Sequence, residues 1–202
     1  MDIAENRPSL HNLTLEVVRD GSIEQCRELC DELMAYQKSK AALAPEAFDA
    51  MNFDTRMKRS YENALDSQVI VAKDNGVPVG YVFSTIDLVA EEDRAAVPAW
   101  APVAEAETAR GFYPDWLRLP AKIGCLSNLY VRDAYRRTGL GSKLFDEAIE
   151  WLENHPDATD IFIYVSNGND SALRFYLDRG FKYSHEVFGG FIHAVYRSKP
   201  GR

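Results

Sequence analysis

The chain has 202 residues, 46% hydrophobic and 27% charged, a composition typical of a folded globular protein and unlike that of a disordered one. This length supports one sizeable core, so we predict a single domain over residues 1–202, with 1–11 as a loose N-terminus. The net charge of -8 argues against a general nucleic-acid binder, because phosphate backbones are bound through Lys and Arg. It fits a cationic partner, or simply solubility.

Nothing in the sequence has the pattern of an export signal or a membrane span. The N-terminus lacks a basic start followed by an apolar run, and no stretch approaches the ~20 apolar residues that cross a bilayer. The three cysteines, Cys26, Cys30 and Cys125, form no C-x-x-C pairs and no disulfide framework. We therefore expect a cytoplasmic protein with no metal and no membrane partner, whose cysteines are small buried hydrophobes.

The N-terminal part of the sequence predicts a strand followed by two helices. Residues 13–19 alternate apolar and polar side chains, as a half-buried strand does. An apolar stripe at helical spacing predicts a helix capped by Asp20 or Ser22. Pro45 suits the first turn of a second helix, which we expect to extend to Ala64.

A β-hairpin is predicted next. Residues 68–74 and 77–83 are rich in β-branched and aromatic side chains, and Asn75 and Gly76 between them are a strong hairpin signal. Gly80, inside the second strand, predicts a bulge or the close approach of another backbone.

Residues 88–122 have no regular pattern and contain four prolines. Acidic residues gather at 91–93 and again at Glu105 and Glu107, and four large aromatic residues are interspersed, namely Trp100, Phe112, Tyr113 and Trp116. A structureless connection of this length is uncommon in a compact domain, so this insertion is either partly helical or a functional lid.

The C-terminal part of the sequence regains strong order. Residues 125–131 predict a strand, residues 140–152 an amphipathic helix and residues 161–165 a strand at the centre of a sheet, which together make a crossover unit. We expect Asn169 and Asp170 to cap a further helix that ends at Gly180. Two closing strands, 181–188 and 191–197, then form an antiparallel pair around Gly189 and Gly190.

The junction between the strand at 125–131 and the following helix predicts an anion site. Gly139 and Gly141 lack Cβ atoms and allow a ligand to approach the main chain, while the helix N-terminus offers unpaired N–H groups and partial positive charge. Nearby cations that could face a phosphate are Arg132, Arg136, Arg137 and Lys143. The spacing differs from that of a dinucleotide-binding fingerprint and from that of a P-loop.

Two motifs in this region resemble those of the GNAT superfamily of N-acetyltransferases. The run LSNLYVRDAYRRTGLGSKLFDEAIEWL, which begins at Leu126, is similar to the family's cofactor-binding motif, and NDSALRFYLDRGF, which begins at Asn169, is similar to its following motif. The detailed match covers roughly residues 123–183. The resemblance implies an α/β (α+β) fold: one domain with a central mixed, mostly antiparallel sheet of about seven strands, flanked by about four helices, with the extra segment 88–122 before the central strand.

The resemblance also implies acetyl-CoA as co-substrate and assigns residues to it. Main-chain groups of Leu129, Tyr130 and Val131 would hold the pantetheine arm, and Asn169 would lie near the pantetheine or the adenosine end. The pyrophosphate would meet main-chain N–H groups of Arg136, Arg137, Thr138, Gly139, Leu140, Gly141 and Ser142. Tyr176 matches the family's frequent general acid, and a phenol with a pKa near ~10 suits protonation of a leaving thiolate.

The general base is left open by the sequence. Some family members have a glutamate on the central strand, where this chain has Ser127 and Asn128, neither of which is a base at neutral pH. These two could orient a water or hold the thioester, while a carboxylate or histidine elsewhere takes the proton. The candidates are Asp87, Asp115, His185, Glu186 and His193.

The predicted function is acetyl-CoA-dependent N-acetyltransferase activity, in which a primary amine attacks the thioester directly in a ternary complex. The alternative is a non-catalytic acyl-CoA-binding sensor or assembly module of the same fold. The acceptor would be a small-molecule or peptide amine, and a cationic one suits the acidic chain. Residues 88–122 are either part of its pocket or else a surface elaboration or a homodimer contact.

Overall fold

Seven strands form one mixed sheet in the computed structural model of this chain, which describes residues 12–19, 21–101 and 111–199. The order across the sheet is β1-β2-β3-β4-β5-β7-β6, and every neighbouring pair is antiparallel except β4 and β5. The strands are β1 (Leu13–Val17), β2 (Asp66–Asp74), β3 (Val77–Val89), β4 (Ala121–Val131), β5 (Asp160–Ser166), β6 (Lys182–Val187) and β7 (Ile192–Ser198). The expected N-terminus 1–11 lies outside the described residues.

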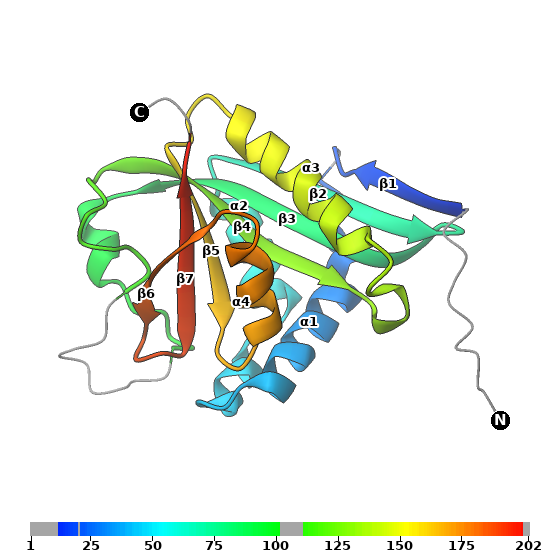
Figure 1. Ribbon diagram of the computed structural model, residues 1–202, viewed down its shortest axis with the longest axis horizontal. Helices are drawn as coiled ribbons and strands as arrows, with labels where there is room; N and C mark the ends of the chain where they lie inside the picture. Colours follow the sequence, from blue (N-terminus) through cyan, green and yellow to red (C-terminus); the bar gives the residue numbers. More distant parts are fainter. Residues whose placement is uncertain (1–11, 20, 102–110, 200–202) are drawn as a thin grey trace.

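Helices cover both faces of this sheet (Figure 1). The α-helices are α1 (Arg27–Lys40), α2 (Arg59–Asn63), α3 (Leu140–Asn154) and α4 (Asp170–Leu177). Shorter helical turns are η2 (Ile23–Cys26), η3 (Pro45–Ala50), η4 (Phe53–Lys58), η5 (Glu91–Ala95) and η6 (Asp133–Tyr135). The predicted mixed, mostly antiparallel sheet flanked by helices is therefore confirmed.

Successive side chains of β2 point to opposite faces of the sheet, and each set packs against a different group of helices. Ile70 and Ala72 point to the face covered by α3 and α4, whereas Val69 and Val71 point to the face covered by α1 and η4. Burial of each such large apolar side chain contributes roughly 1.5–3 kcal/mol, and the two clusters hold the sheet between two helical layers.

Helix α3 follows its predicted pattern closely. Leu144, Ala148 and Leu152 recur every four residues and all three are fully buried against the sheet. Helix α4 also ends as expected. The N–H of Phe181 donates to the carbonyl of Tyr176 at 3.2 Å, and Gly180 takes the left-handed conformation with φ of 85°.

The predicted hairpin joins β2 to β3 through Asn75 and Gly76, both with positive φ. The expectation for Gly80 is also confirmed. The β2–β3 register shifts beside it, and a Cβ at this position would lie 2.9 Å from the carbonyl oxygen of Tyr130.

The predicted second helix is wrong in its continuity. Residues 45–64 form three short pieces, η3, η4 and α2, because Asn52 starts a new helical segment. Its side chain accepts hydrogen bonds from the N–H groups of Asp54 and Thr55, at 2.9 and 3.1 Å. The hydroxyl of Thr55 accepts in return from the N–H of Asn52, which completes a capping box. The first helix is entered through η2 after Ser22, and Asp20 lies outside the described residues.

Strand β3 continues to Val89 and β4 begins at Ala121, so the connection is shorter than the predicted irregular segment. Its described part contains one short turn, η5, where the carboxylate of Asp93 accepts from the N–H of Ala90 at 2.8 Å. Glu105 and Glu107 lie outside the described residues. Near the end of this connection, Leu119 and Pro120 are joined by a cis peptide bond.

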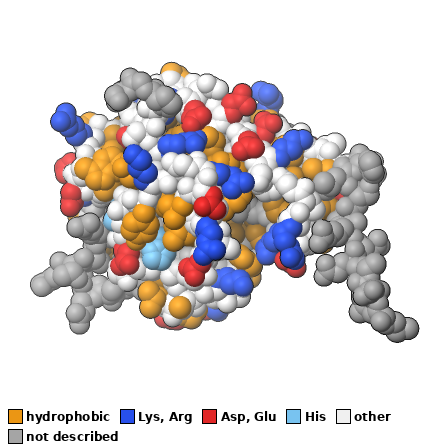
Figure 2. Space-filling view, in the orientation of Figure 1, with side chains coloured by type: hydrophobic (Ala, Val, Ile, Leu, Met, Phe, Trp, Pro, Cys, Tyr) orange, Lys and Arg blue, Asp and Glu red, His pale blue; other side chains and the backbone are white. Residues whose placement is uncertain are grey.

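Acidic and basic side chains alternate over the face in Figure 2, so on this face the net charge of -8 is not gathered into one patch. None of the described helices combines the length and the apolar character that a membrane span requires.

Candidate active site

The sheet opens between β4 and β5 (Figure 1). These parallel strands pair only where residues 124–126 lie beside 161–163. Ser127 is an extra residue in β4, because the register with β3 passes from Leu126 opposite Ser84 to Asn128 opposite Phe83. Beyond this bulge the main chain of β4 is not paired with β5. The split therefore leaves backbone groups that a ligand can bind.

A small cavity of about 50 Å³ occupies this split. It is lined by main-chain and side-chain atoms from β4, β5, α1 and α4, including Ser127, Leu129, Ser166, Asn169 and Tyr176. Three predicted site residues, Leu129, Asn169 and Tyr176, are thus brought together here. Asn169 is the residue before α4, as expected, but its side-chain oxygen accepts from Ser171 at 3.3 Å rather than capping the helix.

Tyr176 is 7% exposed, and its ring packs against Phe145 and Phe181. Burial raises the pKa of its phenol well above the ordinary value, since a phenolate would lose hydration, and the charge of Arg179 opposes this only in part. Within the described residues its hydroxyl forms no hydrogen bond. The phenol is therefore a protonated donor beside the split.

The predicted anion site follows the C-terminal end of β4, beyond the split. Gly139 has φ of 92° and precedes the 15-residue helix α3, whose first turn contains no acidic residue and no side-chain cap. Among the described residues, no main-chain acceptor pairs with the N–H groups of residues 137–142. The N–H of Arg136 already donates to the carbonyl of Asp133 at 3.1 Å. The free N–H groups therefore begin at Arg137, one residue later than expected.

Two of the four expected cations are engaged by the protein itself. Arg132 forms ion pairs of 2.8 Å with both Glu28 and Glu32 of α1. Arg136 donates from Nε to the carbonyl of Val131 at 2.9 Å, and its guanidinium lies 4.3 Å from the ring centre of Tyr36. The exposed side chains of Arg137 and Lys143 form no ion pair within the described part of the chain.

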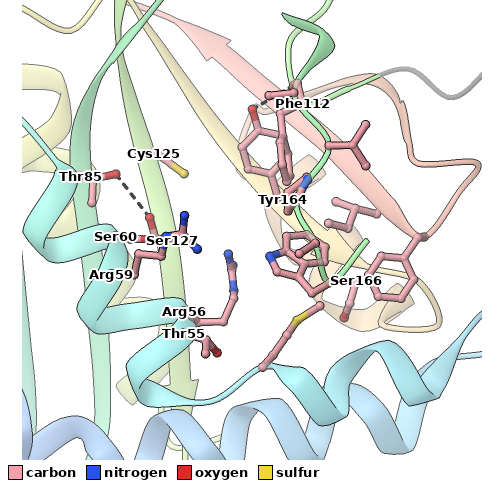
Figure 3. Close-up of a pocket in the computed structure, with 18 of the residues that line it drawn as sticks. Thr55, Arg56, Arg59, Ser60, Thr85, Phe112, Cys125, Ser127, Tyr164 and Ser166 are labelled. Carbon is pink, nitrogen blue, oxygen red and sulfur yellow. Dashed lines mark hydrogen bonds between the residues drawn. The ribbon is translucent and has the colours of Figure 1, made fainter. Parts of the chain in front are cut away.

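A larger pocket of about 580 Å³ adjoins the split, a volume typical of small-molecule sites. One wall is aromatic and apolar and comes from η3, the insertion and the end of the sheet. Its members include Phe48, Met51, Trp100, Phe112, Tyr113, Tyr164 and Phe191. The opposite side is polar and comes from η4, α2, β3 and β4 (Figure 3).

One carboxylate, Asp87, lines this pocket among the described residues. The hydroxyl of Thr85 donates to Asp87 Oδ2 at 2.7 Å and lies 3.4 Å from the hydroxyl of Ser127 (Figure 3). Because the single hydroxyl proton of Thr85 is used on Asp87, Ser127 is the donor of the second bond. Burial raises the pKa of Asp87, and the hydrogen bond from Thr85 opposes this effect. The result is a chain of hydroxyls from the β4 bulge to a half-buried carboxylate.

The other four candidate bases do not line this pocket. Asp115 and Glu186 are exposed. His185 has Nε2 2.9 Å from the carbonyl of Gly111, and His193 has Nδ1 3.3 Å from the hydroxyl of Tyr183.

Sequence reasoning missed Arg56 and Arg59, which project into the pocket from η4 and α2 (Figure 3). Their only signal was their spacing, because residues three apart share one side of a helix. Asn52, which starts that helical segment, was the unrecognised cause of their placement.

Cys125 also lines the pocket, but burial raises the pKa of its thiol to about 12. It is therefore protonated at neutral pH and a poor nucleophile. Cys26 and Cys30 are fully buried in the core, as predicted. Within the described residues no group of three or more His, Cys, Asp and Glu side chains is placed to hold a metal ion.

The split, the helix N-terminus and most of the pocket residues described above lie within the part of the chain that matches a known protein family. A profile of the acetyltransferase (GNAT) family matches residues 34–181, which include the split, the cradle before α3 and both sequence motifs. The chain belongs to this family. The resemblance inferred from the two motifs is thereby confirmed.

Solved structures of similar fold cover nearly the whole chain. NAA60 of Arabidopsis thaliana in complex with a bisubstrate analogue has a TM-score of 0.54 at 14% identity, over 94% of this chain and 99% of that one. PaiA N-acetyltransferase of Thermoplasma acidophilum in complex with coenzyme A has a TM-score of 0.57 at 15% identity, over 92% of this chain and 99% of that one. PH1933 of Pyrococcus horikoshii OT3 has a TM-score of 0.57 at 18% identity, over 94% of this chain and 99% of that one. No curated protein matches in sequence.

Proposed function

We propose that this GNAT protein transfers the acetyl group of acetyl-CoA to a primary amine by direct attack in a ternary complex. The observation that carries the proposal is that the two cavities meet. The small cavity in the β4–β5 split and the larger pocket share Gln37, Ser127, Tyr164 and Ser166. A donor in one and an acceptor in the other would therefore have their reacting groups at Ser127.

A buried polar atom at this junction supports a ligand there. Ser166 is 5% exposed, and among the described residues its hydroxyl oxygen has no hydrogen-bond partner. Buried hydroxyls are almost always paired in folded proteins, so an unpaired one that lines two cavities favours a bound polar group.

The donor fits the split and the cradle. We assign the pantetheine arm to the main chain of β4 at Leu129, Tyr130 and Val131, which does not pair with β5, and the pyrophosphate to the N–H groups that precede and open α3. Helix N-termini stabilise anions through these N–H groups and the helix dipole. PaiA and NAA60 were solved with coenzyme A or a bisubstrate analogue, which supports this choice of donor for the shared fold.

The proposed chemistry has two proton transfers. The neutral amine attacks the thioester carbonyl, a C–N bond forms, and the nitrogen loses a proton through the hydroxyls of Ser127 and Thr85 to the carboxylate of Asp87. The tetrahedral intermediate then collapses, the C–S bond breaks, and the thiolate takes a proton from Tyr176. Solvent returns the proton from Asp87 to Tyr176, so the net products are the amide and the free thiol.

Replacement of Tyr176 by Phe tests this assignment. Because Phe preserves the ring packing and removes only the acidic proton, we expect kcat to fall by about 10²-fold or more, with acetyl-CoA affinity unchanged. The measurement is thiol release from acetyl-CoA across a panel of primary amines, with calorimetry for acetyl-CoA binding.

A different result would favour the alternative function. If the native protein binds acetyl-CoA tightly and no amine stimulates thiol release, the protein is a non-catalytic acyl-CoA-binding module. If Tyr176→Phe keeps the native kcat, the protein is an enzyme but Tyr176 is not its general acid.

A further inference from the structure

We propose that the acceptor amine carries a carboxylate, and that Arg56 and Arg59 bind it. This inference rests on the proposed function and specifies the class of acceptor. Both guanidinium groups point into the larger pocket, on the side that holds Thr85 and Ser127 (Figure 3). They come from the consecutive elements η4 and α2, three residues apart, and both line the same side of the pocket.

The two arginines have no acidic partner within the described residues. Several half-buried arginines elsewhere in the described chain are matched with carboxylates: Arg27 with Asp54 at 2.6 Å, Arg132 with Glu32 at 2.8 Å, and Arg197 with Glu153 at 2.6 Å. Arg56, which is half-buried, instead lies 5.7 Å from the ring centre of Trp100. Arg59 is exposed, and within the described part of the chain no hydrogen bond or ion pair involves its side chain. Two unmatched guanidinium groups facing one cavity favour a planar anion as ligand.

The charges that line the pocket support the same conclusion. Among the described residues its charged members are Arg56, Arg59 and Asp87, so this described part of the lining is net positive even when the carboxylate is ionised. Glu91 and Glu92 of the insertion are exposed and are not among the described residues that line the pocket. A chain with a net charge of -8 thus directs positive charge at its candidate acceptor site.

The other residues that line the pocket indicate the remaining chemical groups of the acceptor. Asp87 and its hydroxyl chain suit the amine, the arginines suit the carboxylate, and the aromatic wall suits an apolar body between or beside them. Hydrophobic walls with a few placed polar groups are typical of sites for small ligands. The acceptor class is therefore an amino acid with an apolar side chain, or a compact derivative of one, rather than a polyamine.

Binding measurements test this class without relying on turnover. We compare 3-phenylpropionate with its uncharged amide on the full-length protein saturated with coenzyme A, by calorimetry. The carboxylate is expected to bind at least about tenfold more tightly, since charge-assisted hydrogen bonds to a guanidinium are lost in the amide. Arg56→Gln combined with Arg59→Gln should remove this preference, and each single change should reduce it.

The matched control is Arg118→Gln, which changes an exposed arginine in the insertion that does not line the pocket. It should keep the carboxylate preference. Every variant is also checked for coenzyme A affinity and thermal stability, and the single arginine variants stand in if the double variant does not fold.

A second arm uses acceptors. Amino acids with increasing separation between amine and carboxylate are compared with their amides by mass spectrometry of the N-acetyl product. We expect kcat/KM to favour the acid by about tenfold or more at the best separation. The less basic amine of the amide makes this a stringent comparison.

Each failure has a distinct meaning. Equal binding of the carboxylate and the amide, no binding of either, or a preference that survives in the double variant would overturn the carboxylate site. Acetylation of amines with no preference for the acid would overturn it too, while the proposed function would stand. Carboxylate binding through the two arginines without any amine acetylation would support the site and contradict the proposed function.

Discussion

Burial changes the pKa of Asp87 and of Tyr176 in the same direction, with different consequences for their roles. A raised pKa makes the carboxylate of Asp87 a stronger base than an ordinary aspartate. A raised pKa keeps the phenol of Tyr176 protonated throughout the accessible pH range. Burial thus makes Asp87 on β3 a stronger base and keeps Tyr176 on α4 protonated, as a general acid must be.

The pH profile follows from these directions. The ionised form of Asp87 is the active one, so kcat is expected to fall as the pH drops through its pKa, which lies above the ~3.9 of a free aspartate. Tyr176 should cause no loss of activity up to about pH 10, because its pKa is raised above that of a free tyrosine. Asp87→Asn should lower kcat by about 10²-fold and abolish the acidic limb.

The acceptor amine also titrates, so its contribution to the pH profile of kcat must be separated from that of Asp87. Two acceptors whose amines differ in pKa are compared, because a limb that belongs to Asp87 stays at the same pH while a limb that belongs to the amine moves. An acidic limb that persists unchanged in Asp87→Asn would exclude Asp87 as the base.

Residue types alone did not identify the pocket cations. Arg56 and Arg59 sit in a polar sequence that is equally typical of a solvated helix surface. Their significance comes from the pocket wall formed by residues remote in sequence, including Trp100 and Tyr164. Asp87 was one of five candidate bases for the same reason, and the fold selects it by placing it near Ser127.

At the scale of elements, local pattern was sufficient where one element determines its own shape. The β2–β3 hairpin, α3 and α4 were predicted because turn residues and apolar periodicity specify them locally. The second helix was predicted as continuous because its apolar stripe is continuous, whereas the capping box at Asn52 divides it. The split between β4 and β5 depends on a bulge and on pairing between distant strands, which periodicity does not report.

The cradle before α3 gives a prediction at this scale. Gly139 has a left-handed φ, and no atom lies within 4 Å of a Cβ built there. We expect Gly139→Ala to cost about 1–2 kcal/mol of stability through backbone strain and to weaken acetyl-CoA binding by about tenfold, because the methyl group would occupy the space of the pyrophosphate. Thermal denaturation and calorimetry measure the two effects.

The control is Gly76→Ala in the β2–β3 turn. Gly76 has φ of 82° and equally open surroundings, so it shares the strain of Gly139. It should lose similar stability and keep its acetyl-CoA affinity. Equal affinity losses in the two variants, or none in Gly139→Ala, would contradict the cradle.

At the scale of the whole molecule, the sheet consists of two parts joined along β4 and β5. Strands β1 to β4 form one antiparallel part and β5 to β7 the other, and only a short ladder joins them. A cofactor in the split would add hydrogen bonds to this join. It would therefore stabilise the contact between the two parts as well as supply the acetyl group.

Hydrogen exchange tests this effect of the cofactor. Acetyl-CoA is expected to slow amide exchange at residues 127–131 and 164–166 and in the first turn of α3, with little change in the β1–β2 pair. The β1–β2 pair serves as the internal control. Uniform protection of all strands, or protection confined to other regions, would place the cofactor elsewhere.

The most direct measurement of direct transfer is a single turnover with labelled acetyl-CoA bound to excess protein. We predict that label appears on the added amine in one step, that none is lost from acetyl-CoA without amine, and that the protein never carries an acetyl group. Cys125→Ala should behave as the native protein does, because its thiol is protonated at neutral pH. Acetyl-protein formed before the amide, or bound acetyl-CoA that no amine consumes, would contradict direct transfer at the β4–β5 split.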